Sequence, residues 1–182
     1  MQGNRDLYRA AAKAVNHRFF LVDVIENVDD YLDLLEALAD ATEEDTIDIH
    51  INSPGGDLAI VAQIVHHMTR TKGLVVTHAE GEVCSGGSLI FFSGHQLDVG
   101  DFSEFLAHGP HGYAGGKLQD RLDGGKHTKE YVRNFYEKVY GPFYSKAEIN
   151  AILRGKEHYE TADQMNKRLE KALEKMEKEF AD

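Results

Sequence analysis

The fold of this chain is decided by one stretch, GEVCSGGSLIFFSG, at Gly81–Gly94. A strand leads into a glycine-rich corner with Ser85 at its apex, and an apolar segment, Leu89–Phe92, follows. This order predicts a strand, a tight turn and a buried helix, with the serine at the helix N-terminus. The dipole and the free backbone N–H groups at a helix N-terminus favour negative charge. A hydroxyl nucleophile is useful at such a position.

The bulk properties restrict the class of protein. A length of 182 residues predicts one domain, over residues 1–182, with enough chain for one core. The formal net charge of -11 argues against nucleic acid or an anionic membrane surface as a partner. There is no long apolar run, and the N-terminus is too polar for a secretory signal. The only cysteine, Cys84, rules out an intramolecular disulfide, so we expect a cytoplasmic protein.

Strand and helix patterns alternate along the first part of the chain. The expected strands are His17–Val24, Ile47–Ile51, Leu74–Ala79 and Phe102–Ala107. The expected helices are Asp29–Asp40, Leu58–Met68 with Asp57 as its N-cap, and Ser85–Ser93. This alternation predicts an α/β fold, with helices packed on a largely parallel sheet.

The composition changes after His108. The segment Gly109–Gly125 contains six glycines, which is typical of a mobile segment or of an extended ribbon that other backbone approaches closely. A long helix is expected over Lys126–Tyr140. Capping boxes beginning at Ser145 and at Thr161 predict two more helices, the second running close to the C-terminus.

A second glycine turn, Ser53–Gly56, follows the strand at Ile47–Ile51. The C-terminal ends of parallel strands gather at one crevice, so we expect this turn to meet the serine corner. The N–H groups of Gly56 and Gly86 are then the candidate oxyanion donors. A serine in a glycine-rich turn is by itself more often a simple turn residue. The second turn is what favours a nucleophile.

His108 is the candidate general base, because it ends an apolar strand beside the serine corner. His111, in a looser loop, is the weaker candidate. Among the 31 acidic residues, composition alone selects no third member. Buried packing is the favoured role of Cys84, against that of a cysteine nucleophile. No metal is expected, since neither an HExxH nor a CxxC spacing occurs.

Three segments together resemble the Clp protease (ClpP) family. They are IDIHINSPGG at Ile47–Gly56, the corner at Gly81–Gly94, and FLAHGPHGYAGG at Phe105–Gly116. The similarity extends from about Arg18 to Met165. It implies the ClpP/crotonase-like fold of stacked ββα units, with a projecting helical handle at about residues 109–142. It also implies a serine endopeptidase that forms heptameric rings, stacked in pairs as a tetradecamer around a chamber.

The resemblance also implies roles for single residues. Ser85 corresponds to the nucleophile, His108 to the base, and Gly56 and Gly86 to the oxyanion donors. Glu157 falls where the family has its catalytic aspartate, before a D-x-[FL]-[LM]-[ST]-A segment. The substrate-binding ribbon corresponds to Gly109, Gly112, Gly115 and Gly116. The implied partners are further copies of the chain, a peptide or unfolded protein, and an AAA+ unfoldase; no cofactor is implied.

Two departures keep other functions open. The residue after the serine is usually methionine in this family and is Gly86 here, and Glu157 replaces an aspartate. A catalytically impaired assembly subunit therefore remains an alternative. Without a catalytic role, Glu157 is a surface glutamate near a helix start, stabilised by the helix dipole. A second alternative is an acyl-CoA enzyme of the crotonase type, which uses the same paired N–H site but usually lacks the serine–histidine pair.

Overall fold

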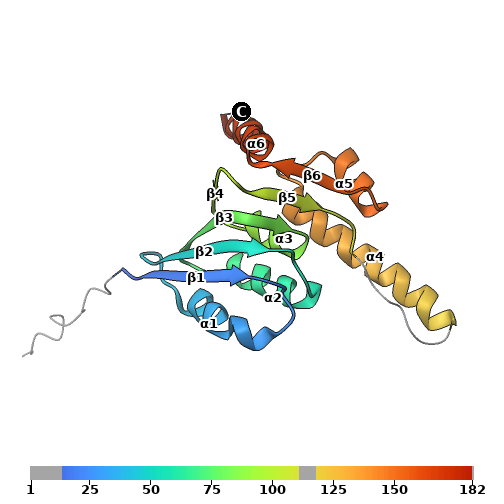
Figure 1. The fold of residues 1–182 in the computed structure, drawn as a ribbon, viewed down its shortest axis with the longest axis horizontal. Helices are drawn as coiled ribbons and strands as arrows, with labels where there is room; N and C mark the ends of the chain where they lie inside the picture. Colours follow the sequence, from blue (N-terminus) through green and yellow to red (C-terminus); the bar gives the residue numbers. More distant parts are fainter. Residues whose placement is uncertain (1–13, 111–117, 182) are drawn as a thin grey trace, which may run out of the picture.

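The computed structural model describes residues 14–110 and 118–181. In this part of the chain six strands form one sheet in the order β1-β2-β3-β5-β6, with β4 also paired to β3 (Figure 1). The strands are β1 Asn16–Val22, β2 Thr46–Ser53, β3 Leu74–Cys84, β4 Gln96–Val99, β5 Glu104–Ala107 and β6 His158–Thr161. All neighbours pair in parallel except β5 and β6, which are antiparallel. The largely parallel sheet expected from the sequence is confirmed.

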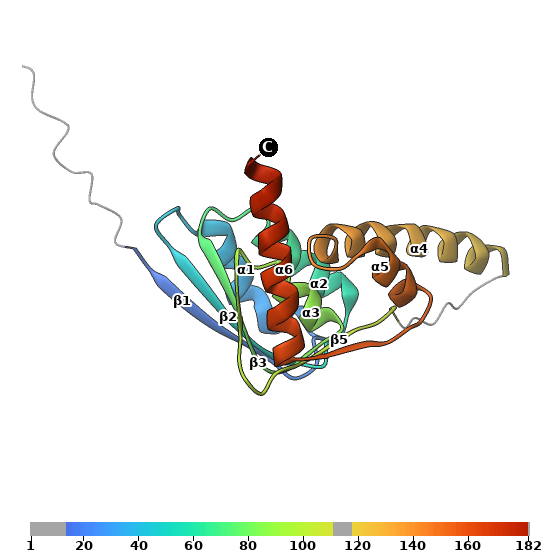
Figure 2. The same ribbon diagram turned by 90° about the horizontal axis from the view of Figure 1, so that it is seen from above.

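Helices cover one face of this sheet. They are η1 Val28–Tyr31, α1 Leu32–Asp40, α2 Leu58–Met68, α3 Gly86–Phe91, α4 Leu118–Tyr140, α5 Lys146–Leu153 and α6 Ala162–Ala181. Figures 1 and 2 show α1, α2 and α3 behind the strands, whereas the face of β1, β2 and β3 that is turned to the viewer in Figure 1 has no helix over it. The outer part of α4 projects beyond the sheet. Among the helices of the described residues, none is long and apolar enough to span a membrane.

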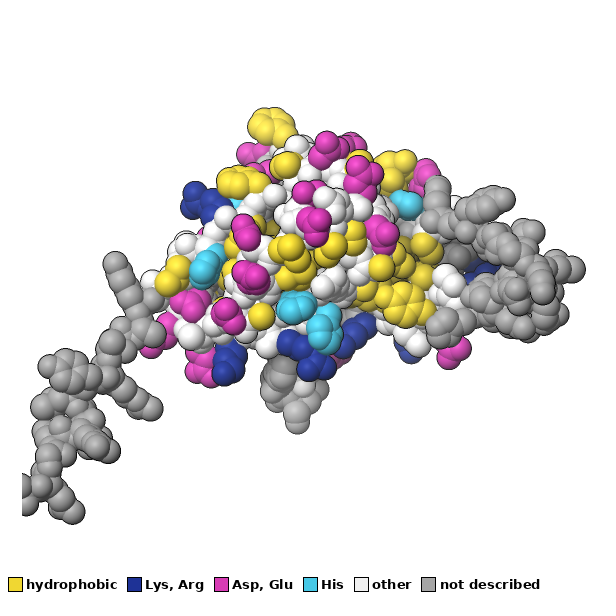
Figure 3. Space-filling view, turned by 90° about the horizontal axis from the view of Figure 1, so that it is seen from below, with side chains coloured by type: hydrophobic (Ala, Val, Ile, Leu, Met, Phe, Trp, Pro, Cys, Tyr) yellow, Lys and Arg dark blue, Asp and Glu magenta, His cyan; other side chains and the backbone are white. Residues whose placement is uncertain are grey.

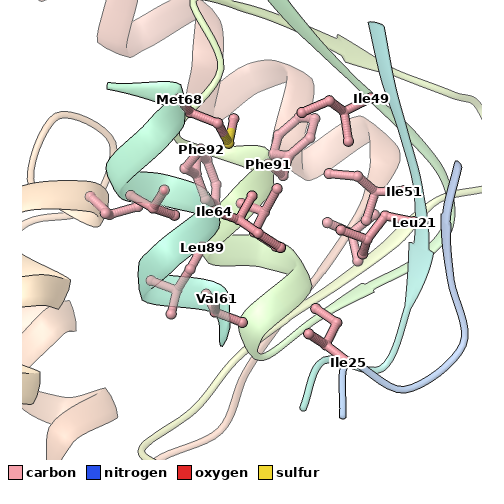
Figure 4. Close-up of a cluster of buried hydrophobic side chains, with 14 of the residues drawn as sticks. Leu21, Ile25, Ile49, Ile51, Val61, Ile64, Met68, Leu89, Phe91 and Phe92 are labelled. Carbon is pink, nitrogen blue, oxygen red and sulfur yellow. The ribbon is translucent and has the colours of Figure 1, made fainter. Parts of the chain in front are cut away.

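The core lies between the sheet and these helices. Alternate residues of β2, Ile47, Ile49 and Ile51, are fully buried, as expected for a strand with one face against helices. Figure 4 shows the side chains that meet there. They are Leu21, Ile25, Ile49 and Ile51 from the sheet side, Val61, Ile64 and Met68 from α2, and Leu89, Phe91 and Phe92 from α3 and its end.

The capping predictions are confirmed. The carboxylate of Asp57 accepts a hydrogen bond of 2.7 Å from the N–H of Ala59 at the start of α2. Ser145 and Glu148 form a reciprocal capping box at the start of α5. Thr161 and Gln164 bond reciprocally at the start of α6. These local bonds satisfy N–H groups that have no partner inside a helix.

The main differences from the sequence prediction are three boundaries and one additional strand. β3 continues through the predicted corner to Cys84, and β5 begins only at Glu104, because Phe102 is an exposed turn residue. β4 was not predicted. α4 begins at Leu118, so the last part of the expected glycine ribbon is helical. Helix propensity across the longer segment and the buried C-terminal half of α4 outweigh the cost of its two glycines, about 1 kcal/mol each.

The uncovered face of the sheet carries a row of rings and carboxylates. Phe20, His50 and His78 lie opposite one another in register on β1, β2 and β3, and their rings stack at centroid distances of 4.9 and 4.4 Å. The imidazole of His78 bonds to Asp48 through Nε2, at 2.9 Å, and to Asp98 through Nδ1, at 3.0 Å. Since an ionised carboxylate only accepts hydrogen bonds, this geometry fits an imidazolium.

Candidate active site

The candidate site is centred on the corner between β3 and α3. Ser85 has φ 52° and ψ −119°, a backbone conformation that non-glycine residues rarely adopt. Such strain costs about 1–3 kcal/mol and is concentrated at functional sites. The Ser85 N–H donates to the carbonyl of Leu106 on β5 at 2.7 Å. Its half-buried side chain occupies the N-cap position but makes no capping hydrogen bond. The hydroxyl is therefore not used to stabilise the helix.

The Ser53–Gly56 turn packs directly against this corner. A β-carbon at Gly55, which has φ +94°, would lie 2.7 Å from Cβ of Ser85 and 2.6 Å from the nitrogen of Gly86. The turn is fixed from behind, because the Ser53 hydroxyl donates to the Asp23 carbonyl at 2.5 Å and accepts from the Gly55 N–H at 3.1 Å. The predicted meeting of the two glycine turns is thus found.

The two candidate oxyanion donors lie next to each other. A β-carbon at Gly86 would lie 3.4 Å from the nitrogen of Gly56. Gly86 is the first residue of α3, so its N–H has no acceptor within the helix. Around Gly56 the Gly55 carbonyl and the Asp57 N–H both bond to Ile25, whereas the Gly56 N–H has no acceptor among the residues that the structure describes. Both N–H groups are thus available to a ligand.

His108 directly follows β5. Cys84 and Leu106 are partners in the parallel pairing of β3 with β5, so the chains continue side by side to Ser85 and His108. Nδ1 of His108 lies 2.6 Å from the carbonyl oxygen of Gly109. A carbonyl only accepts, so Nδ1 carries the proton, and a neutral ring then has its lone pair on Nε2. This is the tautomer that a general base needs.

The structure brings Glu157 close to His108 through the backbone. Ala107 pairs with His158 in the antiparallel ladder, so the next two residues across the ladder are His108 and Glu157. The carboxylate of Glu157 is exposed and accepts a hydrogen bond of 3.1 Å from the hydroxyl of Tyr159. Nδ1 of His108 bonds instead to the Gly109 carbonyl. The register therefore supports the predicted acid, while its side chain is engaged elsewhere.

Two other residues that the sequence singled out, Cys84 and Gly109, lie in the described part of the chain. Cys84 is buried, and its burial, together with the nearby charges of Glu82 and Glu104, raises the pKa of the thiol to about 11. A thiol with this pKa is protonated near neutral pH, which agrees with a packing role. Gly109, a predicted substrate-binding residue, packs closely against α5, because a β-carbon there would lie 3.0 Å from the carbonyl oxygen of Ile152.

Three of the predicted substrate-binding residues lie outside the described residues. They are Gly112, Gly115 and Gly116. The same holds for His111, the weaker candidate base.

Sequence reasoning missed the residues that hold the site from behind. Tyr136 and Tyr140, on α4, reach the backbone of His108 and the Ser85 corner through hydrogen bonds. On β6, the carboxylate of Glu160 accepts the Nε–H of Arg168, which lies 2.9 and 3.0 Å from its two oxygens. The two tyrosines could not be predicted, because their partners are far away in the sequence and no local pattern distinguishes them from core residues.

Comparison with known protein families identifies the family of this chain. A model of the Clp protease family matches residues 5–151, which is more than half of the chain. The matched segment includes Ser85, His108, Gly56 and Gly86 and ends before Glu157. No curated protein matches the chain in sequence.

Proposed function

We infer that this chain, which belongs to the Clp protease family, is a serine endopeptidase with Ser85 as its nucleophile. Membership confirms the resemblance drawn from the sequence, and with it the ClpP/crotonase-like fold. It also supports a peptidase function at the level of the family. The observation that carries the finer proposal is the strained backbone of Ser85. The hydroxyl of this serine does not cap α3, and the residue packs against the Gly55–Gly56 turn.

The proposed reaction is acyl transfer. Nε2 of His108 takes the proton of the Ser85 hydroxyl as Oγ forms a bond to the substrate carbonyl carbon. The N–H groups of Gly56 and Gly86 donate to the oxyanion, which is worth on the order of 10²–10³-fold in rate for each donor. The imidazolium then protonates the leaving amine as the C–N bond breaks. Water, deprotonated by the same imidazole, hydrolyses the acyl-enzyme and restores Ser85.

Glu157 is proposed as the acid that stabilises the imidazolium. Its backbone position opposite His108 supports this role, and its carboxylate would leave the Tyr159 hydroxyl to approach Nδ1. Until then the Gly109 carbonyl orients the ring. The bond to Tyr159 is also the observation that favours the second candidate function, an assembly subunit with impaired turnover.

The proposed assembly is the family's ring, two heptamers stacked around a chamber. Large apolar side chains on the uncovered face and edge of the sheet support association, because exposed apolar patches mark interaction sites. Phe20 is 63% exposed and Val22 is 55% exposed on β1. Figure 3 shows apolar side chains in the middle of a further face, between acidic side chains on one side and histidine and basic ones on the other.

The proposed substrate is an extended peptide or an unfolded protein. It would add as a strand beside the segment that begins at Gly109, so that backbone hydrogen bonds supply most of the affinity. An AAA+ unfoldase is the proposed partner that delivers such a substrate.

Hydrolysis of an unfolded protein tests the proposal. The assembled wild type is compared with Ser85→Ala and with Ser93→Ala, which removes a hydroxyl bonded to the Leu89 carbonyl at 2.8 Å, just after α3. We expect cleavage by the wild type and the Ser93 variant and none by Ser85→Ala. Cleavage that survives in Ser85→Ala would refute the proposed nucleophile. An assembled wild type that cleaves neither an unfolded protein nor short peptides would favour the impaired subunit.

A further inference from the structure

Two buried tyrosines on α4 contact both halves of the candidate site. Tyr136 donates its hydroxyl to the backbone carbonyl of His108 at 2.9 Å. Tyr140, four residues later and therefore one turn along the same helix face, lies with its hydroxyl 2.7 Å from Oγ of Ser88. The two rings meet edge to face at a centroid distance of 5.1 Å. One turn of α4 is thus connected to the base and to the nucleophile corner.

The bond from Tyr140 continues to Ser85. The Ser88 hydroxyl donates to the carbonyl of Ser85 at 2.7 Å. A hydroxyl has a single proton, so Ser88 cannot also donate to Tyr140, and the tyrosine must be the donor in that pair. The chain of hydrogen bonds therefore runs from the Tyr140 hydroxyl to Ser88 and from Ser88 to the carbonyl of the strained serine.

Burial keeps both phenols in the form that donates. Tyr140 is completely buried and Tyr136 is 2% exposed. Burial raises the pKa of Tyr136 to about 12 and the pKa of Tyr140 further still. Water has little access to these hydroxyls, so the Tyr136 hydroxyl depends on the His108 carbonyl and the Tyr140 hydroxyl on Ser88. Phenylalanine would fill nearly the same volume, which indicates that the hydroxyls have a role that packing does not explain.

We propose that Tyr136 and Tyr140 are positioning residues that fix the imidazole of His108 relative to the hydroxyl of Ser85. The inference rests on the proposed function. Tyr136 bonds directly to the carbonyl of His108, and Tyr140 acts on the carbonyl of Ser85 through Ser88. One turn of α4 joins the two tyrosines. Turnover then depends on two hydroxyl groups that take no part in the reaction itself.

The test uses Tyr136→Phe, Tyr140→Phe and Ser88→Ala, with Tyr131→Phe as the matched control. Tyr131 is on the same helix but is 45% exposed. The measurements are the rate of fluorophosphonate labelling of Ser85 and kcat and KM for a short peptide, with thermal unfolding followed in parallel. Each lost hydrogen bond should lower the labelling rate and kcat about two- to tenfold. KM should stay the same, because the substrate contacts are intact.

A double-mutant cycle gives the sharper readout. Tyr140→Phe and Ser88→Ala interrupt the same chain of bonds, so the double variant should lose no more kcat than the more impaired single variant. Tyr136→Phe should add its full effect to either. If the wild type is labelled, and Tyr136→Phe and Tyr140→Phe are labelled as fast as Tyr131→Phe, the inference is overturned and the proposed function stands. A wild type that is not labelled at all would overturn the proposed function, and the inference with it.

Discussion

Gly55 and Ser85 lie so close that no side chain fits between them: a β-carbon at Gly55 would be 2.7 Å from Cβ of Ser85. Gly55→Ala should therefore disturb the serine corner itself. The φ of +94° adds strain for any L side chain. We expect a loss of folding stability of about 1–3 kcal/mol and near-complete loss of Ser85 labelling, measured by chemical denaturation and intact mass.

Gly155 supplies the control for this variant. It has φ +96°, almost the same as Gly55, but a β-carbon there would meet nothing within 4 Å. Gly155→Ala therefore measures the backbone strain alone. If both variants label at the wild-type rate, the close packing of the turn on the serine corner does not matter for the site.

Gly86 and Val61 form a second tight pair. A β-carbon at Gly86 would lie 2.6 Å from Cγ2 of Val61, in α2. This contact is a physical reason for glycine where the family usually has methionine. Gly86→Ala alone should destabilise the protein by about 1–3 kcal/mol through overpacking. Adding Val61→Ala should recover part of that stability relative to the sum of the two single variants. Strict additivity in denaturation experiments would contradict the steric explanation.

Arg168 holds the strand that precedes the C-terminal helix. Its guanidinium bonds to Glu160 and Glu148 and lies 4.0 Å from the ring centre of Tyr144. Glu160 is only 8% exposed, so Arg168→Met removes the guanidinium from a buried carboxylate and leaves it with the Tyr144 hydroxyl, at 2.8 Å, and His158, at 3.5 Å. We expect a loss of about 3–5 kcal/mol in unfolding free energy.

Lys175 provides the comparison on the same helix. It forms a surface pair with Glu179 at 3.8 Å, and Lys175→Met should cost less than about 1 kcal/mol. Equal losses for Arg168→Met and Lys175→Met would show that burial of the Glu160 pair contributes nothing.

The imidazole of His78 should make stability depend on pH. Burial lowers its pKa, but hydrogen bonds and charge from Asp48 and Asp98 outweigh this, so the pKa is raised above the usual 6.5. The folded protein then holds the proton more tightly than the unfolded chain. The stabilisation is complete below about pH 6.5 and is lost as the pH rises through the raised value.

Unfolding of the wild type and of His78→Gln should be compared at pH 5.5 and pH 9. The advantage of the wild type is expected to shrink toward pH 9. His66→Gln, on the exposed side of α2, is the control. An advantage that grows with pH would contradict a raised pKa of His78 in the folded protein.

Local chemistry explains which parts of the fold were predictable. The alternating isoleucines of β2, the Asp57 cap and the two capping boxes each depend on residues within a few positions. β4 has only four residues, and it is defined by pairing with β3 some 20 positions away. The glycines before Lys126 suggested a loose ribbon, but helix formation there is decided by cooperativity with the buried end of α4.

The residues of the candidate site likewise fall into those that local patterns predict and those that they do not. Ser85 and Gly56 stand in short patterns whose spacing fixes where they lie, so the sequence located them. The bonds from Tyr136 to His108 and from Tyr140 to Ser88 join positions 28 and 52 residues apart. Such contacts follow from how α4 packs on α3, which one sequence does not encode in any local pattern. Glu157 is intermediate: the family resemblance selected it, whereas its backbone position opposite His108 and its bond to Tyr159 are found only in the structure.

The central claim is that Ser85 is an activated nucleophile. The measurement that tests it most directly is the intact mass of the assembled wild type and of Ser85→Ala after reaction with a serine-directed fluorophosphonate. The proposal predicts one adduct per chain on the wild type and none on the variant. An adduct that persists in Ser85→Ala, or an assembled wild type that takes up no label, would contradict it.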